Sequence, residues 1–189
     1  MRDFDTVVEV KPVKDHFVGK TVRGDCYEGQ TLIIATGAKP QRLNVPGEIR
    51  LAGRGLSYSA ATHASLFLGK DVAVVGSGRR AQWAAASLAR KAHQVYLLAH
   101  EPLVTTPLVS KLGQMENVEI FEGATVQKVC GADFVEHIVA AMPDGKMREI
   151  PVKGMFVKLT RTPNSELMQE WIDCDSRGHI IVDAYCATS

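Results

Sequence analysis

Apolar residues along the chain gather in short runs that are separated by glycine, proline and charged residues. The most compact run, VAVV at residues 72–75, leads into Gly76-Ser77-Gly78 and then into an alanine-rich segment at 82–92. This order predicts a buried strand, a tight turn and a helix. A second β-type run, QVYLLA at residues 94–99, follows the helix and completes a predicted βαβ unit.

The glycine turn gives this unit a candidate chemistry. Glycine lets the backbone turn tightly and approach a pyrophosphate closely, while the N–H groups of the helix N-terminus face the anion. Ala81 stands at the third small position of the dinucleotide fingerprint, where helix and strand pack together. Glu101 follows the second strand, where an acidic residue reads the adenosine ribose. The same segments also describe a βαβ unit that binds nothing.

The segments before the central unit predict strands, a linker and a short helix. β-type runs occupy most of the first 37 residues. The last of them, TLIIATG at 31–37, is typical of a buried strand that delivers its final residues, Thr36 and Gly37, to a site. Residues 39–57 hold prolines and glycines without a period and predict an extended linker. Residues 58–70 predict a short helix.

The segments after the central unit predict one helix and an antiparallel β-layer. Residues 102–114 favour a helix that begins at Thr106-Pro107, because proline suits the first helical turn. Alternating apolar residues at 117–131 predict strands. The turn signal Pro143-Asp144-Gly145-Lys146 joins two strand-like runs and predicts a β-hairpin. The hairpin supplies the antiparallel layer of a three-layer domain.

The final segments of the chain predict a return to irregular and extended structure. Residues 161–174 favour a loop and a short helix, and residues 176–189 favour a strand that runs to the C-terminus. No internal repeat or low-complexity tract is visible in the sequence.

Composition narrows the class of protein. The 189 residues are 46% hydrophobic and 23% charged with a net charge of +1, which is ordinary globular composition. No apolar run approaches the roughly 18 to 20 residues that cross a bilayer, and the first residues lack a signal-peptide layout. We therefore expect a cytoplasmic protein that binds neither membrane nor nucleic acid.

The cysteines and histidines indicate no metal site. The histidines are dispersed, and only His63 and His100 fall near the candidate site. Four cysteines are widely separated with no CxxC pair, which favours reduced thiols: Cys26, Cys130, Cys174 and Cys186.

Seven segments occur in an order that resembles one family. They are LIIATGA (32–38), PGE (46–48), GRGLSY (53–58), GKDVAVVG (69–76), GMFV (154–157), TPN (162–164) and IVDA (181–184). Together they are similar to the thioredoxin reductase-like FAD/NAD(P)-dependent pyridine nucleotide-disulfide oxidoreductases, close to the flavoprotein reductase subunit of alkyl hydroperoxide reductase. Each motif alone is weak, but their shared order spans nearly the whole chain.

The resemblance implies an α/β fold and a domain layout. Residues 51–158 would form a Rossmann-like three-layer ββα domain that binds NAD(P)H, with a parallel sheet, helices on one face and an antiparallel β-layer on the other. Residues 1–50, which include the linker, and residues 159–189 would be pieces of a FAD domain. Thr36 and Gly37 would lie on the flavin side. The family's N-terminal GxGxxG and late GD motif do not occur here, so we expect FAD in the intact parent and not in this stretch.

The chain departs from the family at the redox dithiol. Where the family has a CxxC after GRGVSY, this sequence has Ser59 and Thr62, and His63 replaces the acid that follows. A hydroxyl cannot form a disulfide or carry two electrons, so no catalytic residue is assigned there and thioredoxin reduction through this site is not expected.

A second departure concerns the coenzyme. NADPH users in the family place His-Arg-Arg after the second strand, whereas this chain has Ala99-His100-Glu101. A carboxylate repels the 2′-phosphate and accepts hydrogen bonds from a ribose diol, which favours NADH over NADPH. Arg79 and Arg80 either meet a phosphate or simply face solvent.

A third departure is Thr160, which stands where the family has a glycine close to the nicotinamide. Thr160 either narrows the approach of the nicotinamide or is a tolerated loop substitution.

Three functions follow from these observations. The first is a flavoprotein oxidoreductase of thioredoxin reductase type that takes hydride from NADH and passes it to FAD in the intact parent, without a dithiol. The second is a non-catalytic nucleotide-sensing or interaction domain. The third, disulfide reduction by the remaining cysteines, is the weakest because no two are close in sequence. A nicotinamide dinucleotide is the implied partner, and a redox-protein acceptor and a homodimer are further partners to test.

Overall fold

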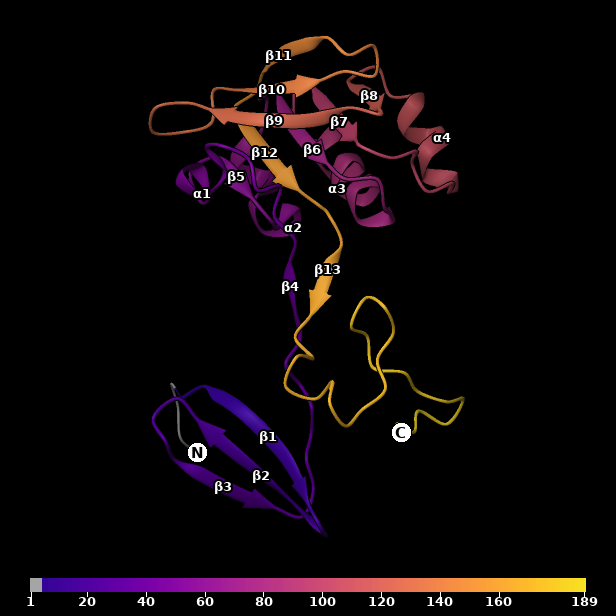
Figure 1. Ribbon diagram of the computed structural model, residues 1–189. Coiled ribbons are helices and arrows are strands. Elements are labelled where there is room, and N and C mark those ends of the chain that lie inside the picture. Colours follow the sequence, from indigo (N-terminus) through magenta and orange to yellow (C-terminus); the bar gives the residue numbers. More distant parts are fainter. Residues whose placement is uncertain (1–4) are drawn as a thin grey trace. The chain divides into compact units, whose positions relative to one another are not determined.

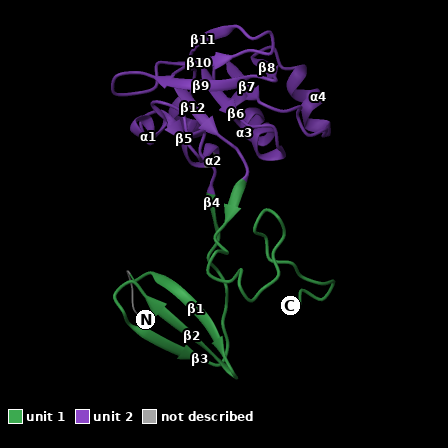
Figure 2. Cartoon of the chain, in the orientation of Figure 1, with its two compact units in different colours: residues 1–39, 161–189 green, residues 40–160 purple. Residues whose placement is uncertain are grey.

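The computed structural model describes residues 5–189 (Figure 1). The chain divides into two compact units, one formed by residues 40–160 and the other by residues 1–39 with 161–189 (Figure 2). The chain passes between the units near β4 (Ala38–Pro40) and β13 (Arg161–Pro163), which pair in a two-stranded sheet. Each unit has its own architecture.

A five-stranded parallel sheet forms the centre of unit 40–160. Its order is β5-β12-β6-β7-β8, with every neighbouring pair parallel. The strands are β5 (Leu56–Ser57), β12 (Gly154–Val157), β6 (Val72–Val75), β7 (Val95–Ala99) and β8 (Val118–Glu122). The predicted βαβ unit is confirmed and lies in the middle of this sheet.

Helices cover one face of the parallel sheet. α3 (Arg79–Ala89) and α4 (Pro107–Gly113) pack on this face with the short α2 (Ala60–His63) and the 3₁₀ helix η1 (Ala64–Phe67). Thr106 caps α4, because its hydroxyl accepts a hydrogen bond from the Leu108 N–H at 3.2 Å. The predicted helix start at Thr106-Pro107 is therefore confirmed.

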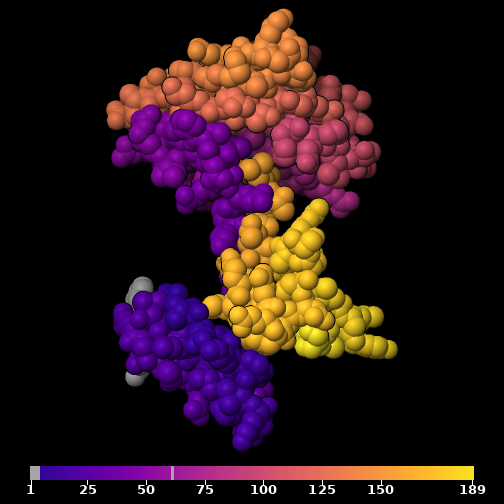
Figure 3. Space-filling model, viewed as in Figure 1, coloured from indigo at the N-terminus to yellow at the C-terminus, as the bar shows by residue number. Residues whose placement is uncertain are grey.

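An antiparallel sheet covers the other face. Its strands are β9 (Thr125–Cys130), β10 (His137–Ala141) and β11 (Met147–Pro151), in the order β11-β10-β9. β10 and β11 form the predicted hairpin. In the space-filling view this layer, coloured orange, forms one continuous side of the unit (Figure 3). The predicted three-layer α/β fold is confirmed.

β6 divides the core of this unit in two. Val72 and Val74 belong to the apolar cluster under the helices, whereas Ala73 and Val75 belong to the cluster under the antiparallel sheet. All four residues are at most 3% exposed. A strand that is apolar at every position is therefore explained by layers on both of its faces.

The prediction of an extended linker at residues 39–57 is wrong from residue 40 onward. Residues 40–57 belong to the compact unit and include α1 (Glu48–Leu51). The segment folds back because the Glu48 carboxylate accepts hydrogen bonds from the N–H groups of Leu43 and Asn44 at 2.9 and 2.7 Å.

Unit 1–39 with 161–189 holds an antiparallel sheet of β1 (Val7–Val13), β2 (His16–Thr21) and β3 (Cys26–Gly29). Three predictions fail here. Residues 31–37 form no strand, and residues 176–189 form only one isolated bridge, between Cys174 and Ile180. The predicted helix within 161–174 is a series of turns.

The physical reason is that a strand needs neighbouring strands to receive its hydrogen bonds. In the described part of the chain no strand pairs with residues 31–37, and Ile33 is 89% exposed. An apolar run without a neighbour on either side stays irregular.

Candidate functional site

Gly76 closes the end of β6 in a conformation that suits glycine alone. Its φ is +144°, and a Cβ on this residue would lie 2.5 Å from the backbone oxygen of Lys158. Its N–H donates to the carbonyl of Leu98 at 2.9 Å. The fold itself therefore requires glycine here, because the backbone that leaves β12 passes directly against the turn.

Gly78 differs from Gly76 in its surroundings. It is the N-cap of α3 with extended dihedrals, φ −85° and ψ 174°, and a Cβ on it would meet no atom within 4 Å. No side chain caps the first turn of α3. The position that a Gly78 Cβ would take is open, and an uncrowded N-cap is what the close approach of a phosphate requires.

Ala81 joins the helix to the strand. It is fully buried, and its Cβ lies 3.3 Å from the position that a Gly76 Cβ would take. A larger residue at either position would push α3 away from β6, so Ala81 does here what the third small residue of the fingerprint does.

Ser77 links the glycine turn to the residues after β7. Its carbonyl accepts a hydrogen bond from the Val104 N–H at 3.1 Å, and its Oγ lies 3.4 Å from Nδ1 of His100. The Nε2 of His100 is in turn 3.7 Å from a carboxylate oxygen of Glu101. Both side chains are exposed, at 48% and 72%. The structure thus brings Ser77, His100 and Glu101 together at one edge of the sheet.

Arg79 and Arg80 begin α3 and are both exposed. Their guanidinium groups add positive charge to the end of the helix where the macrodipole is already positive. The edge that holds the glycine turn is therefore suited to an anion.

Lys158 belongs to none of the sequence motifs, yet it contacts this edge twice. Its N–H donates to the Val75 carbonyl at 2.7 Å, and its buried ammonium group donates to the carbonyl of Tyr58. The signal that could have found it is a lysine directly after the buried run GMFV. Thr160, two residues on, is exposed, and its carbonyl accepts the Gln41 N–H at 3.1 Å.

The two residues predicted to stand where the family has its dithiol form a hydrogen-bonded pair of hydroxyls. Ser59 Oγ and Thr62 Oγ1 are 2.9 Å apart. The neighbouring His63 places Nδ1 at 2.9 Å from Ser57 Oγ and 3.3 Å from the Ser59 carbonyl. The local fold brings the two hydroxyl oxygens within hydrogen-bond distance, and neither residue carries sulfur.

A buried carboxylate contacts Tyr58, the residue directly before this pair of hydroxyls. Glu48 is 1% exposed, and its Oε1 accepts a hydrogen bond from the Tyr58 hydroxyl at 2.9 Å. Burial, followed by the hydrogen bond to Glu48 and its negative charge, raises the pKa of Tyr58 to about 12. Sequence reasoning missed this pair because the two residues are ten positions apart and follow no motif.

Thr36 and Gly37 lie in the other unit. Their carbonyls accept hydrogen bonds from the Asn164 side chain and N–H, at 2.9 and 3.0 Å. These contacts join two of the seven family segments, ATG and TPN, within one unit.

Among residues 5–189 we find neither a disulfide nor a cluster of metal-binding side chains. Cys26, Cys130, Cys174 and Cys186 are free thiols. Within that range no group of three or more His, Cys, Asp or Glu side chains could hold a metal ion. No helix among these residues has the length and apolar character to span a bilayer.

Comparison with known proteins places this geometry in context. Residues 2–189 match the family described as pyridine nucleotide-disulphide oxidoreductase. One relative, an alkyl hydroperoxide reductase subunit of Staphylococcus epidermidis, is 31% identical over 99% of this chain and 38% of its own length. A protein named NADH dehydrogenase from Bacillus subtilis is 31% identical over 93% of this chain and 35% of its own length. The chain thus spans less than two fifths of either relative.

Solved structures agree with the fold. Thioredoxin reductase of Lactococcus lactis superposes with a TM-score of 0.85 at 23% identity, covering 98% of this chain and 62% of the other. Thioredoxin reductase of T. acidophilum gives 0.84 at 26% identity, with the same coverage. With the family match over nearly the whole sequence, the chain belongs to the pyridine nucleotide-disulphide oxidoreductases and is a thioredoxin reductase-like domain of that family.

Proposed function

We propose that this chain is the dinucleotide-binding portion of a flavoprotein oxidoreductase that prefers NADH and works without a redox dithiol. When bound, the dinucleotide supplies a hydride to the FAD of the intact parent. The chain's own residues bind and orient that dinucleotide. Because the chain covers 38% of the Staphylococcus epidermidis relative, the activity of the whole protein is part of the proposal.

The observation that carries the proposal is the contrast between the two glycines of the turn. Gly76 is explained by internal packing, since a Cβ would strike the Lys158 carbonyl. Gly78 is not, because a Cβ there would meet nothing. A glycine that the fold does not need, at the N-cap of a helix without a side-chain cap, supports a role in admitting a pyrophosphate.

The preference for NADH rests on the residues after β7. Glu101 is 72% exposed and lies 3.7 Å from His100, which itself reaches Ser77 of the glycine turn. A carboxylate so close to the turn accepts hydrogen bonds from a ribose diol and repels a 2′-phosphate. Arg79 and Arg80 stand on the first turn of α3 after Gly78, where their positive charge favours a pyrophosphate.

The absence of a dithiol follows from Ser59 and Thr62. A hydroxyl pair at 2.9 Å holds the turn together but cannot take part in thiol–disulfide exchange. Electrons therefore leave the flavin of the parent by a route other than this position, and thioredoxin is not reduced through it.

Calorimetric titration of the chain with NADH and with NADPH tests the proposal. We expect NADH to bind at least about tenfold more tightly, equivalent to about 1.4 kcal/mol. Glu101→Arg should reverse the preference by replacing repulsion with a charge-assisted contact. Glu116→Arg, an exposed carboxylate between α4 and β8, is the matched charge control and should leave the ratio unchanged. Failure of both dinucleotides to bind at millimolar concentration would contradict the proposal.

The second candidate is a non-catalytic nucleotide-sensing or interaction domain, which the loss of both sulfurs favours. The intact parent distinguishes the two. Rapid mixing with NADH bleaches the flavin absorbance if the parent is an oxidoreductase and leaves it unchanged if the domain only senses the nucleotide.

A further inference from the structure

The helical layer formed by α2, η1, α3 and α4 is basic. Between residues 49 and 115 the only acidic residues of the sequence are Asp71 and Glu101, and neither lies in a helix. The Asp71 carboxylate is held by Nδ1 of His93 at 2.6 Å. Six exposed cations stand on or directly beside these helices: Lys70, Arg79, Arg80, Arg90, Lys91 and Lys111. The net charge of +1 hides this layer, because the balancing acidic residues lie elsewhere in the chain.

The outward side of α3 forms the centre of the layer. At 3.6 residues per turn, Arg79, Trp83 and Arg90 lie within about 40° of one another around the helix axis. The opposite side of α3 packs into the core through its alanines and Leu88. Trp83 is 65% exposed, an unusual position for the largest apolar side chain. α3 therefore presents an aromatic ring between cations.

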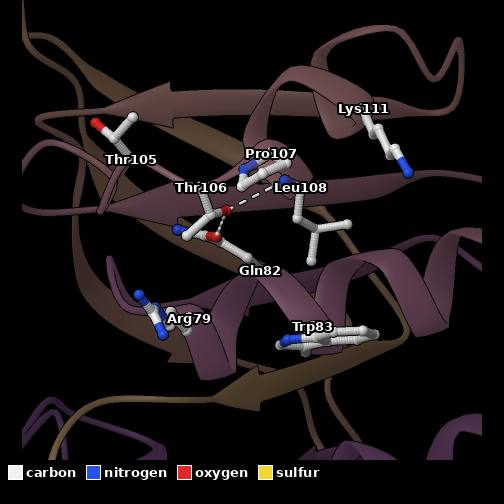
Figure 4. Close-up of a pocket in the computed structure, with 8 residues that line it drawn as sticks. All are labelled: Arg79, Gln82, Trp83, Thr105, Thr106, Pro107, Leu108 and Lys111. Carbon is white, nitrogen blue, oxygen red and sulfur yellow. Dashed lines mark hydrogen bonds between the residues drawn. The ribbon is translucent and has the colours of Figure 1, made fainter.

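α4 joins α3 at its first turns. Arg79 and Trp83 of α3 and Lys111 of α4 line one pocket of about 450 Å³, which lies beside the glycine turn because Arg79 directly follows that turn (Figure 4). The Gln82 side chain is fully buried, and the Thr106 hydroxyl donates a hydrogen bond to its Oε1 at 2.6 Å. This bridge holds the start of α4 against α3, so the three lining side chains stay around one pocket.

The residues after η1 join the other end of α3. The Gly69 N–H donates to the Lys91 carbonyl at 2.8 Å, which places the two segments side by side. Leu66 and Leu68 precede this contact and are 63% and 70% exposed. This end of the layer therefore combines two exposed leucines with Lys70 and Lys91.

This mixture of side chains suits the surface of an anionic membrane. Lys and Arg are attracted to anionic headgroups, while Trp and Leu bury in the boundary between headgroups and acyl chains. A nucleic acid would leave the leucines in water. An acidic protein would have to offer carboxylates at fixed matching positions, whereas lipid headgroups rearrange beneath cations that are spread over three elements.

We propose that the outward face of η1, α3 and α4 binds the surface of a membrane that contains anionic lipids. The six cations supply the attraction, and Leu66, Leu68 and Trp83 enter the headgroup boundary. The contact goes beyond the proposed function and does not require it. It also has an end that lies apart from the dinucleotide site, because Arg90 and Lys91 follow the last turn of α3 and the glycine turn precedes the first.

Co-sedimentation with lipid vesicles tests the proposal. The chain is mixed with vesicles of phosphatidylcholine alone, or with vesicles in which about 30% of the lipid is the anionic phosphatidylglycerol. We expect binding to the anionic vesicles and at least about tenfold weaker binding to the neutral ones. At about 0.5 M NaCl most of the binding should be lost, because salt screens the attraction.

Two pairs of substitutions separate this face from net charge. Arg90→Gln with Lys91→Gln should weaken binding about 25-fold, because each cation near an anionic surface contributes about fivefold, equivalent to about 1 kcal/mol. Lys128→Gln with Lys146→Gln makes the same change in net charge on the antiparallel layer, where both lysines are exposed. This control pair should stay within about threefold of wild type. Thermal unfolding checks that every variant folds.

Fluorescence reports the contact of the indole itself. Trp171 is the other tryptophan, so in a Trp171→Phe background the emission comes from Trp83 alone. Anionic vesicles should shift this emission to shorter wavelength as the indole leaves water. Trp83→Ala should weaken vesicle binding at least about threefold, because an apolar side chain is no longer buried.

The outcomes are separable. Failure of wild type to bind anionic vesicles, or equal weakening by the two pairs of substitutions, would overturn the proposal. Tighter binding to polyglutamate or to DNA than to the vesicles, in the same salt, would assign the face to an acidic protein or a nucleic acid and also overturn it. NADH titration of Arg90→Gln with Lys91→Gln tests the proposed function independently and should give the wild-type affinity.

Discussion

Substituting the two glycines of the turn separates what the fold needs from what a ligand needs. At Gly78 the backbone is already extended and a Cβ meets no atom within 4 Å, so Gly78→Ala introduces no strain in the protein. Alanine restricts the unfolded chain, which stabilises by about 0.4–1 kcal/mol, but it is a poorer N-cap than glycine by a similar amount. We expect the free energy of unfolding to change by less than about 1 kcal/mol.

Gly76→Ala should behave in the opposite way. A φ of +144° is strained for alanine, and the new Cβ would sit 2.5 Å from the Lys158 carbonyl oxygen. Backbone strain of this kind costs about 1–3 kcal/mol, and relieving the overlap must displace backbone at the end of β12. We expect a loss of about 3 kcal/mol or more, which lowers the midpoint of thermal unfolding by about 6–12 °C in a chain of this size.

Circular dichroism melts and calorimetric NADH titrations of the same preparations provide the assay. Gly78→Ala should melt within about 4 °C of wild type and bind NADH at least about tenfold more weakly. Gly113→Ala is the control, because Gly113 also has free space for a Cβ but lies in the last turn of α4. Wild-type binding by Gly78→Ala would refute the assignment of this space to a pyrophosphate. Wild-type stability of Gly76→Ala would refute the packing argument.

Three further outcomes follow from the site. Because its pKa is raised to about 12, Tyr58 should ionise about two pH units above a free tyrosine. The protonated hydroxyl favours the folded state, so its contribution to the free energy of unfolding is intact below about pH 10 and is lost as the pH rises toward about 12. Tyrosinate absorbance, with Tyr58→Phe as the control, measures this ionisation. Tyr58→Phe should itself lower the free energy of unfolding by about 1–2 kcal/mol in denaturant titration, since the buried Glu48 carboxylate loses a donor. The double variant Ser59→Cys, Thr62→Cys should form a disulfide under oxidising conditions. Thiol titration should then count two additional thiols only after reduction. Two additional free thiols before reduction would show that cysteines at these positions do not reach disulfide geometry.

Local patterns in the sequence are sufficient to predict the secondary structure at the centre of the fold. VAVV followed by two glycines predicts β6 and the turn, and Thr106-Pro107 predicts the start of α4, because both signals depend on the residues themselves. The same holds for the hairpin at Pro143, where the turn residues determine the connection.

Long-range contacts are not predictable in this way. The Glu48–Tyr58 pair, the Lys158 contact with Tyr58 and the Gln82–Thr106 bridge all join separate segments without a recurring spacing. The prediction of a strand at TLIIATG fails for a related reason, because β-type composition describes a tendency and only a neighbouring strand turns it into a strand. A motif marks the candidate site in the sequence, whereas no motif marks the pocket beside it.

The unpaired run at 31–37 has a practical consequence for every measurement proposed above. Leu32 and Ile33 are 37% and 89% exposed in a segment of β-forming residues without proline or charge. Such a segment is a template for pairing between copies of the chain, and we expect concentrated solutions to self-associate through it. Ile33→Lys places a charge in the middle of the run without disturbing a buried contact, and it is the natural background in which to purify this chain.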